Sequence, residues 1–191
     1  MEHLIDRDGI ALIDNQWLDL NQAQEFFSAL VKQISWQQEK ISLFGKNIKC
    51  PRLTAFYADA NIKYSYSGIT HVGRQWVGPL VALRALLYER LNISFNSVLC
   101  NFYRDGQDYI GWHSDNEKEV RDGAIAAISL GASRKFQFRH KNDKSLVNIT
   151  LAGGGLLLMT GKLQQYWEHR LPVDKSIILP RISLTFRQIS I

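Results

Sequence analysis

The chain has 191 residues, of which 46% are hydrophobic and 21% charged, and it carries a formal net charge of +5. This composition is ordinary for a soluble globular protein, most economically folded as a single domain. No apolar run approaches the ~20 residues that a membrane span needs, and the N-terminus is charged where a signal peptide would be apolar. We therefore expect a protein that is neither secreted nor membrane-bound.

The two cysteines, Cys50 and Cys100, lack the paired spacing of a metal site. We expect reduced thiols, not a disulfide framework or a structural zinc site. The excess positive charge suits a polyanionic partner, although many basic proteins bind no nucleic acid.

The first part of the chain predicts two amphipathic helices. Between residues 21 and 36, apolar side chains recur at helical spacing: Phe27, Leu30, Val31 and Ile34. A second helix is predicted to begin at Pro79, which favours a first turn, and to present Leu80, Leu83, Leu87 and Leu91 on one stripe. Both stripes indicate packing against a core.

From Ser97 onward the pattern changes to period two, with short segments separated by glycine, asparagine and proline turns. The predicted strands cover residues 98–103, 124–130, 135–138, 147–151, 156–159, 166–171 and 181–188. Short strands at regular spacing after N-terminal helices predict an α+β, mainly β fold. We expect a double-stranded β-helix, or jelly roll, with the helices packed outside.

Three residues form a candidate metal site. His113 and Asp115 are two apart, so in an extended strand they point the same way. Two such residues are usually solvated surface groups, but His169 could complete the set from a distant strand. Two histidines and one carboxylate hold non-heme Fe(II) on one face and leave other positions open.

The last predicted strand places two arginines on one face. Arg181, Ser183, Thr185 and Arg187 alternate with Ile182, Leu184 and Phe186. If the polar face is exposed, the pattern is unremarkable. If it points inward, the guanidinium groups need buried anions, and a dicarboxylate such as 2-oxoglutarate would suit them. Asn101 and Tyr103 share a strand face and could donate hydrogen bonds to it, or could be satisfied interior groups.

Four motifs carry a family resemblance: Asn101-Phe102-Tyr103, His113-Ser114-Asp115, Glu168-His169-Arg170-Leu171-Pro172 and the segment 181–187. Over about residues 42–189, the chain resembles the AlkB family of Fe(II)/2-oxoglutarate nucleic-acid dealkylases, especially its duplex-DNA-repairing branch. The resemblance implies that His113, Asp115 and His169 bind Fe(II). It also implies that 2-oxoglutarate is bound by Asn101, Tyr103, Arg181 and Arg187. Ser183 and Asn116 depart from the residues usual in the family.

The resemblance further implies a nucleotide-recognition lid at about residues 40–75 and a jelly-roll core at about 97–190 within one domain, 1–191. Tyr64 and Tyr66 would stack on a flipped base, and Glu117 would favour a positively charged one. Phe44 would be a wedge in the base stack. Phosphate contacts are expected from Lys40, Lys46, Lys49 and Arg52, and a second clamp from the basic segment 134–141. The plain alternatives are strand-edge tyrosines and solvated charges.

The activity implied by the resemblance is oxidative dealkylation of N-alkylated bases in DNA, of the 1-methyladenine and 3-methylcytosine type. Fe(II), 2-oxoglutarate and O2 would be required, with release of formaldehyde, succinate and CO2. The alternatives are demethylation of methylated RNA or protein by the same core, and a nucleic-acid-binding module without catalysis. We expect a monomer that acts on duplex or single-stranded DNA, in the cytoplasm of a bacterium or the nucleus of a eukaryote.

Overall fold

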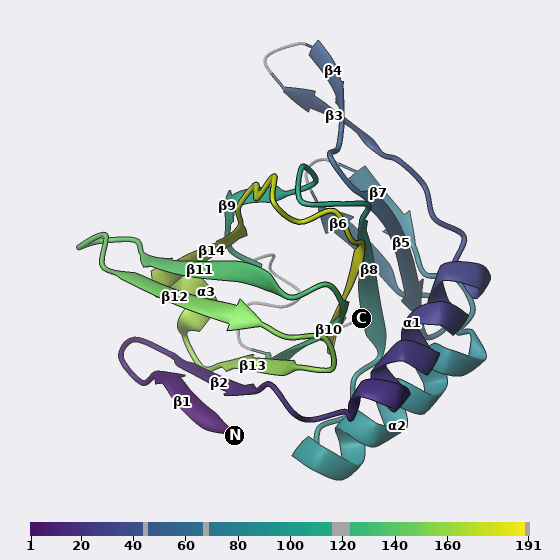
Figure 1. Cartoon of the computed structure of the whole chain (residues 1–191), viewed down its shortest axis with the longest axis horizontal. Helices are drawn as coiled ribbons and strands as arrows, with labels where there is room; N and C mark the ends of the chain where they lie inside the picture. The colour runs from purple at the N-terminus through teal and green to yellow at the C-terminus, as the bar shows by residue number, and fades with distance from the viewer. Residues whose placement is uncertain (44–45, 67–68, 116–122, 190–191) are drawn as a thin grey trace.

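The computed structural model describes residues 1–43, 46–66, 69–115 and 123–189, with backbone alone for 41–43, 46–47, 63–66 and 69–71. Its main feature is a pair of antiparallel sheets that face each other (Figure 1). The seven-stranded sheet has the order β1 (Glu2–Ile5), β2 (Ile10–Asp14), β13 (Leu156–Thr160), β10 (Ile125–Gly131), β15 (Arg181–Arg187), β8 (Ser97–Tyr103), β5 (Leu53–Ala58). The four-stranded sheet has the order β12 (Leu146–Leu151), β11 (Arg134–His140), β14 (Trp167–Leu171), β9 (Ile110–His113).

Two small hairpins lie outside these sheets. One pairs β3 (Lys40–Leu43) with β4 (Lys46–Lys49) and projects away from the body of the molecule (Figure 1). The other pairs β6 (Lys63–Tyr66) with β7 (Ile69–Val72).

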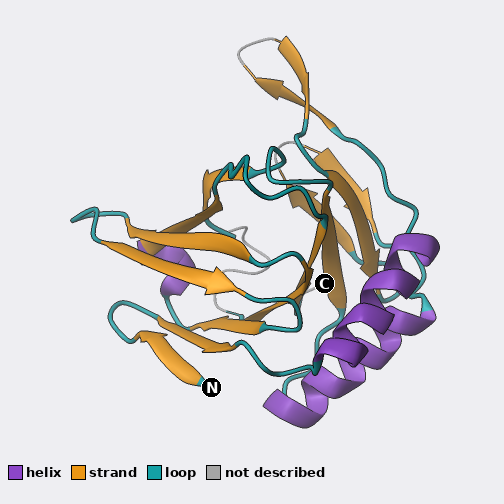
Figure 2. Ribbon diagram, viewed as in Figure 1, coloured by secondary structure: helices purple, strands orange, loops and turns teal. Residues whose placement is uncertain are grey.

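The two long helices, α1 (Leu20–Gln33) and α2 (Gly78–Leu91), cover the outer face of the seven-stranded sheet (Figure 2). Asp19 caps α1 through a reciprocal pair of hydrogen bonds with Gln22, and Pro79 lies in the first turn of α2. The predicted stripes are confirmed by Leu30, Leu80 and Leu83, which are fully buried. A third helix, α3 (Leu163–Tyr166), is a single turn before β14.

The first predicted helix ends earlier than residue 36, because Ile34 adopts an extended conformation. Val31, expected on its apolar stripe, is 39% exposed. No helix in the part of the chain that the structure describes is long and apolar enough to cross a membrane.

The predicted jelly roll is confirmed, and each strand expected after Ser97 is present. The larger sheet also includes β1, β2 and β5, which the sequence analysis did not predict. β5 falls within the range expected for the lid, yet it pairs with β8 along its whole length. β1 and β2 are short, and the charged residues between them hid their alternation of buried and exposed positions.

Strands of the larger sheet carry different side chains on their two faces. On β15, Ile182, Leu184 and Phe186 are fully buried and pack among the helices. The alternate residues of β15 and β8 face the smaller sheet and line a hollow between the two sheets. An apolar outer face therefore fixes the strands, while the inner face of β8 and β15 also carries polar groups.

Candidate active site

The polar face of β15 turns inward, which is the second of the two alternatives left open by the sequence. Arg181 and Arg187 are each 2% exposed. Across the ladder to β8, Arg181 lies opposite Tyr103 and Ser183 opposite Asn101. The hollow between the sheets is lined by Leu99, Asn101, Tyr103, Ile110, His113, Asp115, Ala127, Phe136, Leu151, Met159, His169, Ser183, Thr185 and Arg187.

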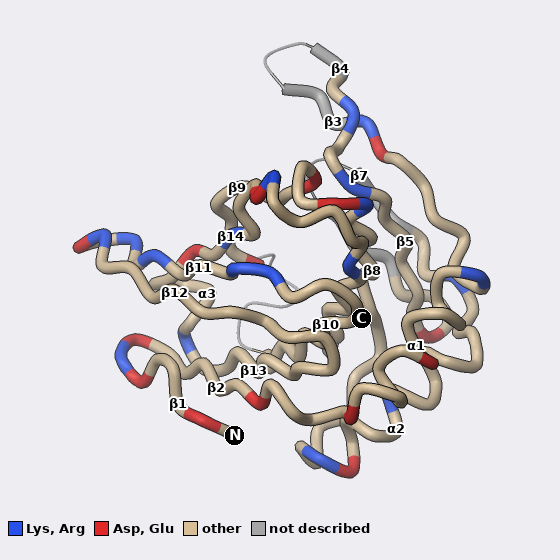
Figure 3. The backbone as a smooth tube through the Cα atoms, in the orientation of Figure 1, with Lys and Arg blue, Asp and Glu red and all other residues tan. Residues whose placement is uncertain are grey.

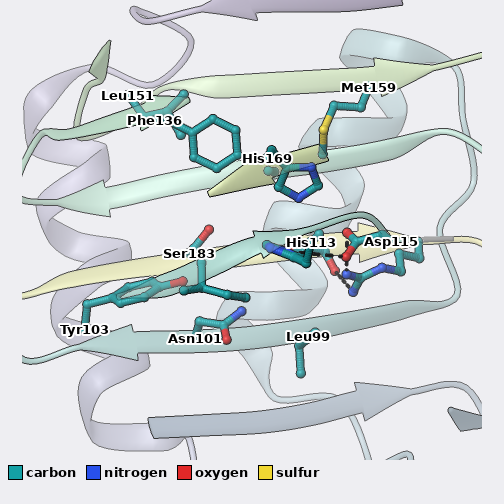
Figure 4. A pocket seen from close by; sticks show the side chains of 14 residues that line it. Leu99, Asn101, Tyr103, His113, Asp115, Phe136, Leu151, Met159, His169 and Ser183 are labelled. Carbon is teal, nitrogen blue, oxygen red and sulfur yellow. Dashed lines mark hydrogen bonds and ion pairs between the residues drawn. The ribbon is translucent and has the colours of Figure 1, made fainter. Parts of the chain in front are cut away.

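Three potential metal ligands converge at one end of this hollow (Figure 4). β9 pairs with β14 so that His113 lies opposite His169, and their ring centres are 4.3 Å apart. His113 Nε2 lies 3.8 Å from Asp115 Oδ1. One ligand atom from each of the three residues lies within 4.8 Å of the others, so a single ion can contact all three.

Neighbouring groups fix the orientation of this triad. His113 Nδ1 lies 2.8 Å from the carbonyl oxygen of Gly111, which leaves Nε2 toward Asp115. The backbone N–H of Asp115 donates to the side chain of Gln164 at 2.9 Å, and the ring of Phe136 stacks on His169 at 5.4 Å. Such outer contacts set the direction of metal ligands.

The charge of the triad suits a divalent cation. Burial lowers the pKa of His113, and lowers that of His169 to about 3 with His113 adding to the shift. Burial alone would raise the pKa of Asp115, but the charge of Arg187 and its hydrogen bond to the carboxylate oppose this effect and hold that pKa below its usual range. At neutral pH the site therefore offers two neutral imidazoles and one carboxylate, which need lose no proton to bind a metal.

Asp115 forms a buried ion pair with Arg187. The Nη2 atom of Arg187 donates to Oδ2 of Asp115 at 2.7 Å, and both side chains are almost fully buried. Oδ1 of the same carboxylate faces His113. One oxygen thus anchors the carboxylate to β15 while the other faces the two imidazoles.

The opposite end of the hollow contains Tyr103, Asn101 and Ser183 (Figure 4). Arg181 lies next to Tyr103, with its guanidinium carbon 5.4 Å from the ring centre, and its Nε donates to Ser129 Oγ at 2.9 Å. Burial lowers the pKa of Arg181 to about 10, so the group stays charged at neutral pH. Within the described residues no carboxylate forms an ion pair with it. A buried cation of this kind fits the carboxylate of a bound ligand.

Arg52 does not lie where the sequence analysis expected it. It is 6% exposed, and its Nε donates to Asn101 Oδ1 at 2.8 Å. This guanidinium is buried against Asn101, which lines the hollow, whereas the expected phosphate contact requires an exposed side chain.

The predicted clamp at 134–141 is also wrong for two of its basic residues. Arg134 is 2% exposed and donates to the backbone oxygens of Asp105, Asp108 and Pro172. His140 is 1% exposed and lies against Asp8. These two side chains hold loops together inside the protein. The Arg134 guanidinium binds backbone oxygens and the His140 ring lies against Asp8, so neither group is exposed for a phosphate contact.

Lys40 and Lys49 are exposed, as a phosphate contact requires, whereas other expected residues fall outside what the structure describes. Phe44, Glu117 and Asn116 lie outside the described residues, and the side chains of Tyr64 and Tyr66 are not described. Three further residues contact the predicted ones and were not expected from the sequence: Gln164, Ser129 and Phe136. A buried glutamine or serine leaves no distinctive pattern in the sequence.

Comparisons with known proteins agree with this geometry. The model of the 2OG-Fe(II) oxygenase superfamily matches residues 10–187. DNA oxidative demethylase ALKBH2 of Mus musculus is 38% identical over 190 residues, covering 95% of this chain and 77% of that protein. Alpha-ketoglutarate-dependent dioxygenase alkB homolog 3 of Mus musculus is 36% identical over 184 residues, covering 91% of this chain and 64% of that protein. The solved structure of OsALKBH1 matches with a TM-score of 0.68 at 14% identity, covering 96% of this chain and 99% of that one.

A jelly roll with two imidazoles and a carboxylate converging between its sheets defines a non-heme iron oxygenase. The chain belongs to the AlkB family of the 2OG-Fe(II) oxygenase superfamily. As a member of that superfamily it uses Fe(II), 2-oxoglutarate and O2.

The buried ion pair yields a stability prediction. Arg187→Met should lower the free energy of unfolding of the metal-free protein by about 3–5 kcal/mol, because Asp115 would be left buried without its cation. Urea denaturation measures the change. The matched control is Arg90→Met, which removes an ion pair with Asp14 whose arginine side chain is 43% exposed. That change should stay below ~1 kcal/mol; equal losses in the two variants would contradict the account.

Proposed function

We propose that this protein is an oxidative DNA demethylase that removes N-methyl groups from bases of the 1-methyladenine and 3-methylcytosine type. The observation that carries the proposal is the convergence of His113, Asp115 and His169 beside a hollow. The other end of this hollow is lined by Tyr103, with the buried Arg181 next to that ring. Relatives that bear the name DNA oxidative demethylase, 38% identical to the chain, support DNA as the substrate.

We assign Fe(II) to the triad, with Nε2 of His113, Oδ1 of Asp115 and His169 as its protein ligands. Arg187 would hold Asp115 ionised and fix which of its oxygens faces the metal. When bound, Fe(II) and 2-oxoglutarate supply an oxidation by O2 that yields succinate and CO2, and the methyl carbon leaves as formaldehyde. The buried walls of the hollow exclude water from this chemistry.

We assign 2-oxoglutarate to the inner face of β8 and β15. The Tyr103 hydroxyl and the Asn101 amide can donate hydrogen bonds there, and Arg181 supplies positive charge behind Tyr103. Because Arg52 donates to Asn101 Oδ1, the amide N–H2 group of Asn101 remains for the ligand. Arg187, which also lines the hollow, belongs to the same cosubstrate proposal in addition to its bond with Asp115.

The proposed DNA surface includes the β3–β4 hairpin, which projects from the body of the molecule (Figures 1 and 3). Exposed Lys49 on this hairpin can contact phosphate. Phe44 as a wedge, and Tyr64, Tyr66 and Glu117 as base contacts, belong to the same proposal. Duplex DNA is its preferred substrate, with single-stranded DNA and RNA as the competing outcomes of the test.

The assignment of the metal ligands leads to a prediction about turnover. The wild-type protein should release formaldehyde and succinate in equal amounts from a duplex oligonucleotide carrying 1-methyladenine. His113→Ala should abolish this turnover with an unchanged circular dichroism spectrum, because a triad cannot lose a ligand and keep its metal geometry. His3→Ala, at an exposed histidine, is the matched control and should retain full activity.

Parallel assays on the same sequence as single-stranded DNA and as RNA decide between substrates. Faster turnover of methylated RNA would replace the DNA proposal. DNA binding without any turnover by the wild-type protein would indicate a binding module instead.

The assignment of Arg181 leads to a prediction that separates cosubstrate binding from chemistry. Arg181→Met should raise the KM for 2-oxoglutarate by ~10-fold or more, as expected for a lost hydrogen bond to a charged group. Its kcat at saturating 2-oxoglutarate should change much less. Arg84→Met, on α2, is the control and should leave both constants unchanged. An unaltered KM in Arg181→Met would refute the assignment.

A further inference from the structure

The outer face of the four-stranded sheet carries a cluster of long side chains directly behind the proposed iron ligands. Side chains alternate along β14, so Arg170 points outward next to the inward-facing His169. Trp112 lies on the same outer face, because its ring contacts the guanidinium groups of Arg139 and Arg170. The cluster consists of Trp112, Gln137, Arg139, Glu168 and Arg170.

Two guanidinium groups lie over the indole ring of Trp112. The guanidinium carbon of Arg139 is 4.3 Å from the ring centre, and that of Arg170 is 4.5 Å away. Both distances are well within the range at which a cation is attracted to an aromatic face. Trp112 thus has two cationic neighbours, each from a different strand.

The two arginines are themselves fixed. Arg139 Nε donates to Glu168 at 2.7 Å, and Arg170 Nε donates to Gln137 at 2.7 Å. The bonds join β11 to β14, and Trp112 then joins β9 to both strands. An arginine held by a second contact loses less freedom when it stacks, so the stack restrains Trp112 more firmly than a mobile side chain would.

β9 needs such restraint more than any other strand of this sheet. It has four residues, lies last in the strand order and, among the strands that the structure describes, pairs only with β14. The pairing is irregular between His169 and Leu171. Yet β9 ends in His113, and Asp115 follows two residues later, so its position sets two of the three proposed ligands.

We propose that Trp112, held between Arg139 and Arg170, is a positioning residue that fixes β9 against β14 and thereby sets the affinity of the site for Fe(II). The proposal rests on the assignment of iron to the triad under Proposed function. A ligand triad tolerates displacements of only about 0.5 Å, whereas a short edge strand with irregular pairing can shift by more. Ordinary surface packing is the competing explanation.

The experiment uses Mn(II), a redox-inert probe, and measures its dissociation constant by electron paramagnetic resonance on the full-length metal-free protein. Trp112→Leu keeps an apolar side chain but removes the aromatic face. It should weaken Mn(II) binding by ~10-fold or more, the range seen when outer partners of metal ligands are lost. Trp112→Phe keeps an aromatic face and should remain within about 3-fold of the wild type.

Trp76 provides a matched control, because Arg84 lies 4.4 Å from its ring centre in a stack of the same kind outside the sheet that carries the ligands. Trp76→Leu should leave the dissociation constant unchanged. The visible absorption bands of bound Co(II) give a second readout: they should change in Trp112→Leu and not in Trp76→Leu, since they report ligand geometry.

The proposal would be overturned if Trp112→Leu kept the Mn(II) affinity and the Co(II) bands of the wild type. It would also be overturned if Mn(II) binding weakened equally in Trp112→Leu and Trp76→Leu. If Trp112→Leu does not fold, the double variant Arg139→Gln/Arg170→Gln carries the same expectation and the same refutation. His113→Ala separates the two hypotheses. If His113→Ala binds Mn(II) as tightly as the wild type, the iron site itself is overturned. If His113→Ala loses Mn(II) binding and Trp112→Leu keeps it, only the role of Trp112 is overturned.

Discussion

The buried ion pair between Asp115 and Arg187 is the contact on which the site depends. It joins the segment just after β9, a strand of the smaller sheet, to β15 in the larger one. Two charges removed from water are tolerated only when each satisfies the other. The pair therefore fixes the spacing of the sheets at the site and keeps Asp115 ionised against the effect of burial. It also leaves one carboxylate oxygen directed at the imidazoles.

The two faces of β15 have different roles. The outer face of β15 is apolar and packs among the helices, which provides the burial that holds the sheet together. Its inner face then carries Arg181, Ser183 and Arg187 in a region shielded from solvent. Charged groups are expensive there unless they have partners. Arg187 has Asp115, and Arg181 has Ser129 and Tyr103, so the strand can hold cations where an anionic cosubstrate would bind.

Much of this arrangement could be predicted from the sequence. Period-two alternation predicted β8 and the strands from β10 to β15, because it follows from backbone geometry, but it did not predict the four-residue β9. The spacing of His113 and Asp115 indicated one shared site, although β9 itself ends at His113. The sequence alone could not decide whether the polar face of β15 pointed inward. It also misplaced Arg52 and Arg134, since an arginine in a buried wall and one on a DNA-contacting surface look identical without their neighbours. Pairing of β1 and β2 with the larger sheet is a long-range choice that no local pattern contains.

The most direct test of the account is an anomalous difference map from anaerobic crystals containing Mn(II) and 2-oxoglutarate. We predict one strong peak in contact with Nε2 of His113, Oδ1 of Asp115 and the imidazole of His169. Density for the keto acid should extend from that peak along the inner face of β8 and β15 toward Tyr103. A peak that misses any of the three residues, or keto-acid density outside the hollow, would contradict the account.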